Sequence, residues 1–231
     1  MDETFLICLP FAGSGASFFK RWRSRTPERL SVVPVQLPGR EERLAESAYT
    51  VASLAAAESL DQITRHPGVM DGRVALFGHS MGAVLAFELA HLLEAGGKPL
   101  TGLFVSGSAG PLQTRENRAS GLSDEEFLAQ VNRLAGYSHP ALDHPEMREL
   151  LLPMLRADVA MHEDYRPASS RPLSCPVTVL RGLDDELVSA ADARQWKSFT
   201  TGSFSSVELP GGHMYLSDDD RALLNFLITA L

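Results

Sequence analysis

The chain has 231 residues, of which 44% are hydrophobic and 22% are charged, proportions that are ordinary for a globular protein. A chain of this length can bury its own core, so collagen-like, low-complexity and disordered classes are excluded. The formal net charge of −8 argues against the concentrated basic surface that binds a phosphate backbone, and we expect no nucleic-acid partner.

The sequence also lacks the signals of a membrane or secreted protein. Glycine, proline and serine interrupt its charge-free runs before they reach the roughly 20 apolar residues that a spanning helix needs. The first residues are acidic, whereas a signal peptide begins with basic ones. We therefore expect a cytoplasmic protein with no membrane partner. One dense basic run, residues 20–25, predicts either a solvated helix face or a docking patch for an acidic partner.

Short apolar runs that predict strands alternate with longer amphipathic runs that predict helices. The expected strands are residues 5–9, 32–37, 74–77, 103–105, 177–180 and 204–209. The expected helices outside the insertion described next are residues 50–65, 81–93, 190–199 and 218–231. Pro34 interrupts the second strand and favours an edge position for it. This alternation predicts an α/β fold with a mostly parallel sheet covered by helices.

One long stretch breaks the alternation, because no clear strand is expected between the fourth and fifth strands. Ser123, followed three residues later by Glu126, forms a capping box that starts a helix, and residues 145–162 predict a second helix. The stretch is too long for an ordinary connection. We predict a single domain over residues 1–231 with a mobile helical lid inserted at about residues 111–166.

The expected lid has more apolar positions than one exposed layer would need. We predict that some of them face the sheet and that others line a chamber for a substrate. These positions are Phe127, Leu128, Val131, Leu134, Leu150, Leu151, Met154 and Leu155.

The motif Gly78-His79-Ser80-Met81-Gly82 matches the G-x-S-x-G pattern of a nucleophile elbow. It follows an expected strand and precedes an expected helix, which is the setting that such a nucleophile requires. We predict that Ser80 is a catalytic nucleophile and that His79 is a packing and hydrogen-bonding residue.

A serine hydroxyl needs a base that is itself oriented by an acid. His213 follows the last expected strand in a Gly-Gly loop, which places it in the chain order expected for the base. The acid should follow the strand that ends near residue 180, where Asp184, Asp185 and Glu186 are candidates. Spacing alone does not decide between Asp184 and Asp185.

The oxyanion of an acyl-transfer reaction needs two backbone donors. We predict that one is the N–H of Met81 and that the other comes from the loop at residues 10–15, with Ala12 favoured over Phe11. That loop also contains two nearby glycines, but Phe18 stands where a dinucleotide-binding fingerprint requires glycine or alanine. No zinc-ligand spacing and no phosphate-binding loop is present, so we expect neither a metal nor a bound cofactor.

Several further segments are similar to one enzyme family. They are Leu9-Pro10-Phe11-Ala12-Gly13, Gln36-Leu37-Pro38-Gly39-Arg40, the serine motif, Leu122-Ser123-Asp124-Glu125-Glu126-Phe127, Leu151-Leu152-Pro153-Met154-Leu155-Arg156-Ala157-Asp158 and Gly211-Gly212-His213-Met214-Tyr215. Together they resemble a type II thioesterase of nonribosomal peptide and polyketide assembly lines, over nearly the whole chain. The resemblance implies an α/β-hydrolase fold and hydrolysis of acyl thioesters from the phosphopantetheine arm of acyl or peptidyl carrier proteins.

The resemblance also indicates which acidic residue orients His213 and which partners the protein has. The family motif G-x-x-D-P-x-V aligns with residues 182–188 and selects Asp185, although Glu186 replaces the proline. The implied partners are carrier proteins and small acyl thioesters, and we expect a monomer. The alternatives are a general carboxylesterase for small oxygen esters, a cyclising thioesterase and a binding module without catalysis.

Overall fold

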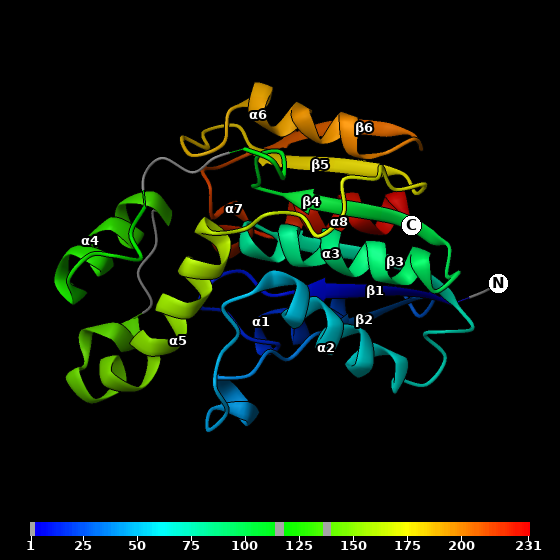
Figure 1. Cartoon of the computed structure of the whole chain (residues 1–231). Coiled ribbons are helices and arrows are strands. Elements are labelled where there is room, and N and C mark those ends of the chain that lie inside the picture. Colours follow the sequence, from blue (N-terminus) through cyan, green and yellow to red (C-terminus); the bar gives the residue numbers. More distant parts are fainter. Residues whose placement is uncertain (1–2, 114–117, 136–139) are drawn as a thin grey trace.

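The computed structural model describes residues 3–113, 118–135 and 140–231. Six strands form one sheet in the order β2-β1-β3-β4-β5-β6, and all five neighbouring pairs are parallel (Figure 1). The strands are β1 (Thr4–Leu9), β2 (Leu30–Pro34), β3 (Arg73–His79), β4 (Leu100–Ser106), β5 (Val177–Gly182) and β6 (Phe204–Leu209). The predicted α/β fold is confirmed, and β2, which contains Pro34, lies at an edge of the sheet as expected.

Helices cover both faces of the sheet. One face packs against α2 (Ala52–Thr64), α3 (Met81–Ala95) and α6 (Ala190–Arg194). The other packs against α1 (Ser17–Lys20), α7 (Tyr215–Asp218) and α8 (Arg221–Ala230). Both faces of β1, β3 and β4 are therefore buried, which explains why these strands form short apolar runs, whereas β6 at one edge of the sheet is largely exposed.

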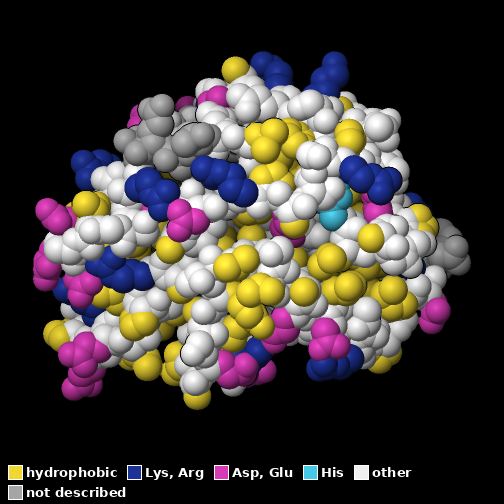
Figure 2. All heavy atoms as spheres, in the orientation of Figure 1, with side chains coloured by type: hydrophobic (Ala, Val, Ile, Leu, Met, Phe, Trp, Pro, Cys, Tyr) yellow, Lys and Arg dark blue, Asp and Glu magenta, His cyan; other side chains and the backbone are white. Residues whose placement is uncertain are grey.

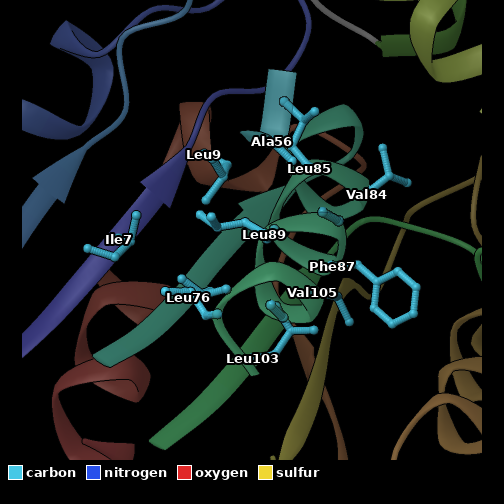
Figure 3. Close-up of a cluster of buried hydrophobic side chains, with 14 of the residues drawn as sticks. Ile7, Leu9, Ala56, Leu76, Val84, Leu85, Phe87, Leu89, Leu103 and Val105 are labelled. Atoms are coloured by element: carbon cyan, nitrogen blue, oxygen red, sulfur yellow. The ribbon is translucent and has the colours of Figure 1, made fainter. Parts of the chain in front are cut away.

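The helix α3 lies at the centre of the larger apolar core. Its side chains Leu85 and Leu89 pack over the strand residues Ile7, Leu9 and Leu76 (Figure 3), and all five are fully buried. Because α3 begins directly after Ser80, this packing fixes the position of the elbow relative to the sheet.

Two of the predicted helices differ in the structure. The expected helix at 190–199 consists of α6 followed by a 3₁₀ turn, Gln195–Phe199. The expected helix at 218–231 is α8, which begins at Arg221, and a short helix that was not expected, α7, precedes it. Between them, Asp219 adopts an extended backbone. Beside it, the buried carboxylate of Asp220 accepts hydrogen bonds from Trp22 Nε1 and Arg25 Nη1, both at 2.7 Å. These long-range bonds bind the chain to the protein body at the break.

The helices α4 (Asp124–Ala135) and α5 (Pro145–Glu163) lie beyond the carboxyl ends of the strands (Figure 1), within the range for which the sequence predicts a lid. The predicted capping box is present: Ser123 Oγ donates to Glu126 at 2.8 Å and accepts from the Glu126 N–H at 3.4 Å. Residues 114–117 and 136–139 of the predicted insertion, and the side chain of Leu134, lie outside the described residues.

These two helices have a small apolar core of their own. Its buried members are Ala119, Phe127, Leu128, Leu142, Leu152 and Leu155. Ala12 of the β1–α1 loop packs against this core, which joins it to the body of the protein. On the face drawn in Figure 2, charged side chains of both signs crowd the outer part of the α4–α5 region, as expected for amphipathic helices. Within the described ranges, no helix combines the length and the hydropathy needed to cross a membrane.

Candidate active site

Ser80 occupies a strained turn between β3 and α3. Its backbone has φ 52° and ψ −114°, a conformation that costs energy for any residue other than glycine. A side chain at Gly78 would overlap the Gly82 carbonyl, and one at Gly82 would overlap the Leu9 carbonyl. The Ser80 N–H donates to the Ser106 carbonyl at 2.8 Å, which braces the turn from β4. The glycines of the motif are therefore required by close backbone packing.

His213 and Asp185 form a hydrogen-bonded pair. The Nδ1–H of His213 donates to Asp185 Oδ2 at 2.9 Å, and the other carboxylate oxygen accepts from the N–H groups of Leu187 and Val188 at 2.9 and 3.0 Å. The Asp185 side chain is fully buried, whereas Asp184 is exposed. The structure thus brings Asp185, and not Asp184, to His213.

These contacts determine the charge of Asp185. Burial alone would raise the pKa of this carboxyl, but the hydrogen bond and the charge of His213, with the two backbone donors, outweigh burial. The pKa of Asp185 therefore lies below its ordinary value, and the group is a carboxylate at neutral pH. A carboxylate at this position orients the imidazole and stabilises its protonated form.

His79 belongs to a second, buried network beneath His213. Its Nδ1 lies 2.8 Å from Ser106 Oγ, which in turn lies 2.6 Å from the Tyr215 hydroxyl. The rings of His79 and His213 are 4.9 Å apart between centroids. Burial, followed by the charge of His213, lowers the pKa of His79 well below its ordinary value, so its ring is neutral. His79 is a packing and hydrogen-bonding residue, as predicted. Tyr215 belongs to a family-like segment, but no pattern in the sequence predicts that it and Ser106 join this network.

The loop after β1 presents backbone donors near the elbow. The Gly13 N–H donates to Asp158 Oδ2 at 2.9 Å, and the Ser14 N–H donates to the Phe11 carbonyl at 3.0 Å. Within the described ranges no atom accepts a hydrogen bond from the Ala12 N–H. Met81 is the first residue of α3, where backbone N–H groups have no partner inside the helix. The N–H groups of Ala12 and Met81 are thus among those left without an acceptor in the described residues, and their role as oxyanion donors stays a prediction.

A buried ion pair joins α5 to this loop. Arg40 donates to both oxygens of Asp158 at 2.8 and 2.7 Å, and the two side chains are 4% and 0% exposed. Arg40 also donates to the Ser14 carbonyl at 2.9 Å. Burial raises the pKa of Asp158, while the Arg40 guanidinium and the Gly13 N–H act in the opposite direction. Both residues occur in the family-like segments of the sequence, but no pattern there predicts that they meet.

Several of these groups border one pocket of about 540 Å³. Ser80, His213 and Ala12 line it, together with two groups of side chains of different character. Apolar side chains of the lid region form one group: Val131, Leu142, Met147, Leu151, Met154 and Leu155. The β1–α1 segment and the start of α7 form the other: Phe11, Phe18, Arg21 and Ser217. Of the predicted chamber positions, Leu150 is instead 45% exposed, and Phe127 and Leu128 belong to the core of the insertion.

Comparisons with known proteins agree on one family. A family model described as a thioesterase domain matches residues 4–231. Thioesterase PikA5 of Streptomyces venezuelae is 36% identical over 228 residues, which cover 95% of this chain and 78% of that protein.

Solved structures give the same result. The RedJ thioesterase from the prodiginine biosynthetic pathway in Streptomyces coelicolor is 36% identical with a TM-score of 0.88, covering 99% of this chain and 85% of that one. The type II thioesterase BorB from the borrelidin biosynthetic cluster is 35% identical with a TM-score of 0.86, covering 99% of this chain and 92% of that one. These neighbours are thioesterases of the α/β-hydrolase type, which confirms the expected fold class.

The paired carboxyls offer a matched test of the acid. We expect Asp185→Asn to lower kcat on a small acyl thioester by about 10³–10⁴-fold, because His213 loses the group that orients it. We expect Asp184→Asn, an exposed change, to leave kcat within about twofold. Steady-state kinetics on the two variants checks this, and a crippled Asp184→Asn beside an active Asp185→Asn would refute the geometry.

Proposed function

The chain belongs to the thioesterase family, and from that premise we propose that it hydrolyses acyl thioesters carried by the phosphopantetheine arm of acyl or peptidyl carrier proteins. The relatives named above act in polyketide and related biosynthetic pathways, which supports the same setting for this chain. The main support for the proposal is that the candidate catalytic groups border one pocket. It is lined by the elbow serine, by His213 bound to Asp185, and by the loop that contains Ala12.

In the proposed acylation, Ser80 Oγ attacks the thioester carbonyl carbon while His213 Nε2 accepts the serine proton. The carbonyl oxygen becomes an oxyanion, which the N–H groups of Met81 and Ala12 stabilise. The carbon–sulfur bond then breaks, and His213 returns its proton to the departing pantetheine sulfur. Asp185 keeps the imidazole in the required orientation throughout.

In the proposed deacylation, a water molecule replaces the thiol. His213 accepts a proton from this water as the oxygen attacks the acyl carbon bound to Ser80. The same two backbone donors stabilise the second oxyanion. The ester bond to Ser80 then breaks, the serine oxygen regains a proton from His213, and a free carboxylic acid leaves. The proposed cycle uses no metal or bound cofactor, and we propose a cytoplasmic monomer that also accepts small acyl thioesters.

The acyl group is proposed to bind on the lid side of the pocket. Apart from Asn132, that side is apolar, and it is formed by α4, by Leu142 and by α5. Burial of methylene groups there gains roughly 0.8 kcal/mol each. We propose that the inserted helices form a lid that encloses the acyl chain, beyond completing the core. A lid of this kind suits a substrate that reaches the serine on a long, thin arm.

The proposed reaction can be tested directly on its substrate. We expect the protein to release a fatty acid from an acyl carrier protein, with intact mass spectrometry showing the loss of the acyl group. Ser80→Ala should reduce the rate by several orders of magnitude while leaving the melting temperature unchanged, because only the nucleophile is lost. Small aryl esters serve as the competing substrate. Faster turnover of the aryl esters than of the carrier thioester would favour a general carboxylesterase.

One methionine and one leucine on α5 allow a test of whether the lid side of the pocket binds the acyl chain. Met147 lines the pocket and is 39% exposed, whereas Leu150 on the same helix does not line it and is 45% exposed. We expect Met147→Trp to shift the preferred acyl chain to a shorter length, because the larger ring fills the chamber. Leu150→Trp is the matched control and should keep the wild-type profile. Hydrolysis rates over a series of chain lengths measure this, and identical profiles for both variants would contradict the chamber.

A further inference from the structure

The pocket wall opposite the lid leads from the elbow to an arginine. Phe11 packs edge-to-face on His79 with ring centroids 5.9 Å apart, and on Phe18 with centroids 5.0 Å apart. The Arg21 guanidinium carbon lies 4.2 Å from the centre of the Phe18 ring. Phe11, Phe18 and Arg21 all line the same pocket as Ser80. This wall, which we call the α1 wall, is therefore apolar near the serine and cationic at its far end.

The guanidinium of Arg21 is held in place by contacts that engage only some of its hydrogen-bond donors. Its Nη2 donates to the Leu216 carbonyl at 3.1 Å and lies 3.2 Å from Asp220 Oδ2. Among the residues that the structure describes, none accepts a hydrogen bond from its Nε or Nη1. The side chain is 45% exposed, so these donors are accessible from solvent. The contacts of Nη2 and of the Phe18 ring hold the guanidinium group in place and leave Nε and Nη1 without an acceptor among the described residues.

The local charge favours an anion. Asp220 is shared by Arg21 and Arg25, the latter at 2.7 Å, so two guanidinium groups face one carboxylate. The other arginine of the pocket lining, Arg40, is buried and bound at both ends of its fork to Asp158. The acidic lining residue Glu41 accepts hydrogen bonds from the backbone and the hydroxyl of Ser17. Arg21 is thus the cation of the described lining that a ligand can reach.

We propose that Arg21 binds the phosphate of the phosphopantetheine arm. A guanidinium is a charge-assisted donor to phosphate oxygens, and the Nε–H and Nη1–H groups of Arg21 are available to a ligand. The arm would then lie along the α1 wall, with its dimethyl-substituted stem against Phe18 and Phe11, and its thioester at Ser80. This inference rests on the proposed function and adds to it the orientation of the bound substrate. The phosphate binds beside α1, and the acyl chain binds beside α5.

The basic run at residues 20–25 is thereby explained in part. Trp22 is buried, and Arg23 Nε donates to the Val32 carbonyl at 3.1 Å, so these two residues pack against the protein body. Lys20 pairs with Glu42 at 3.3 Å on the surface and does not line the pocket. Arg21 is the member of the run that combines pocket lining with exposed donors.

The test compares two substrates that differ only in the phosphate. One is an acyl-phosphopantetheine and the other is the same acyl-pantetheine without phosphate. We expect the wild-type protein to have a KM about tenfold lower for the phosphorylated substrate, with this preference weakening at high salt. In Arg21→Gln the KM ratio between the two substrates should fall to about one, whereas kcat should stay close to wild type. Lys20→Gln, the neighbouring cation outside the pocket, should keep the wild-type ratio.

The outcomes separate this inference from the proposed function. If Arg21→Gln changes the KM of both substrates equally, or if the wild-type protein does not distinguish them, the phosphate site is refuted. Hydrolysis of the unphosphorylated substrate by wild-type protein would still support the thioesterase reaction in that case. If the wild-type protein hydrolyses neither substrate, both proposals fail. Partial recovery of the KM ratio in Arg21→Lys would support a charge at this position over a purely structural role.

Discussion

The buried ion pair between Arg40 and Asp158 joins three segments that are distant in the chain. Asp158 belongs to α5, Arg40 to the loop after β2, and Gly13, whose N–H also binds Asp158, to the loop after β1. Removing one partner of such a pair leaves an unpaired charge in the interior and typically costs about 3–5 kcal/mol. The inserted helix α5 is therefore bound to the loop that carries the Ala12 donor. We interpret the insertion as part of the active site as well as its cover.

This connection limits how a lid could open. Asp158 lies near the end of α5, so that end is fixed to the protein body. The pocket-lining residues Met147, Leu151 and Met154 lie one to three turns earlier on the same helix. A movement that admits substrate would be expected in α4 and the first half of α5, with the Asp158 end as its pivot. The oxyanion loop would then keep its geometry while the acyl chamber changes its volume.

Much of the fold and the geometry of the elbow around Ser80 could be predicted because their signals are local. The strands are short apolar runs, and the elbow around Ser80 needs glycines at two positions where a side chain would overlap backbone. His213 follows from its place after the last strand. The choice of Asp185 over Asp184 depended on resemblance, since spacing alone left it open. In the structure the two residues differ in burial, which one sequence does not encode. The separate helix α7 and the start of α8 at Arg221 were not predicted, because the contact that holds the chain between them joins Asp220 to Trp22, which is far away in the sequence.

We interpret the Arg40–Asp158 pair as the contact that positions the loop proposed to stabilise the oxyanion. A double-mutant cycle with Arg40→Gln and Asp158→Asn, read as kcat on one acyl thioester at a temperature where every variant is folded, tests it most directly. Each single variant should lower kcat by roughly tenfold or more, and the double variant should lose little beyond either single one, as residues that act as a unit do. Wild-type kcat in the single variants, or losses that multiply independently in the double variant, would show that the pair does not position the loop.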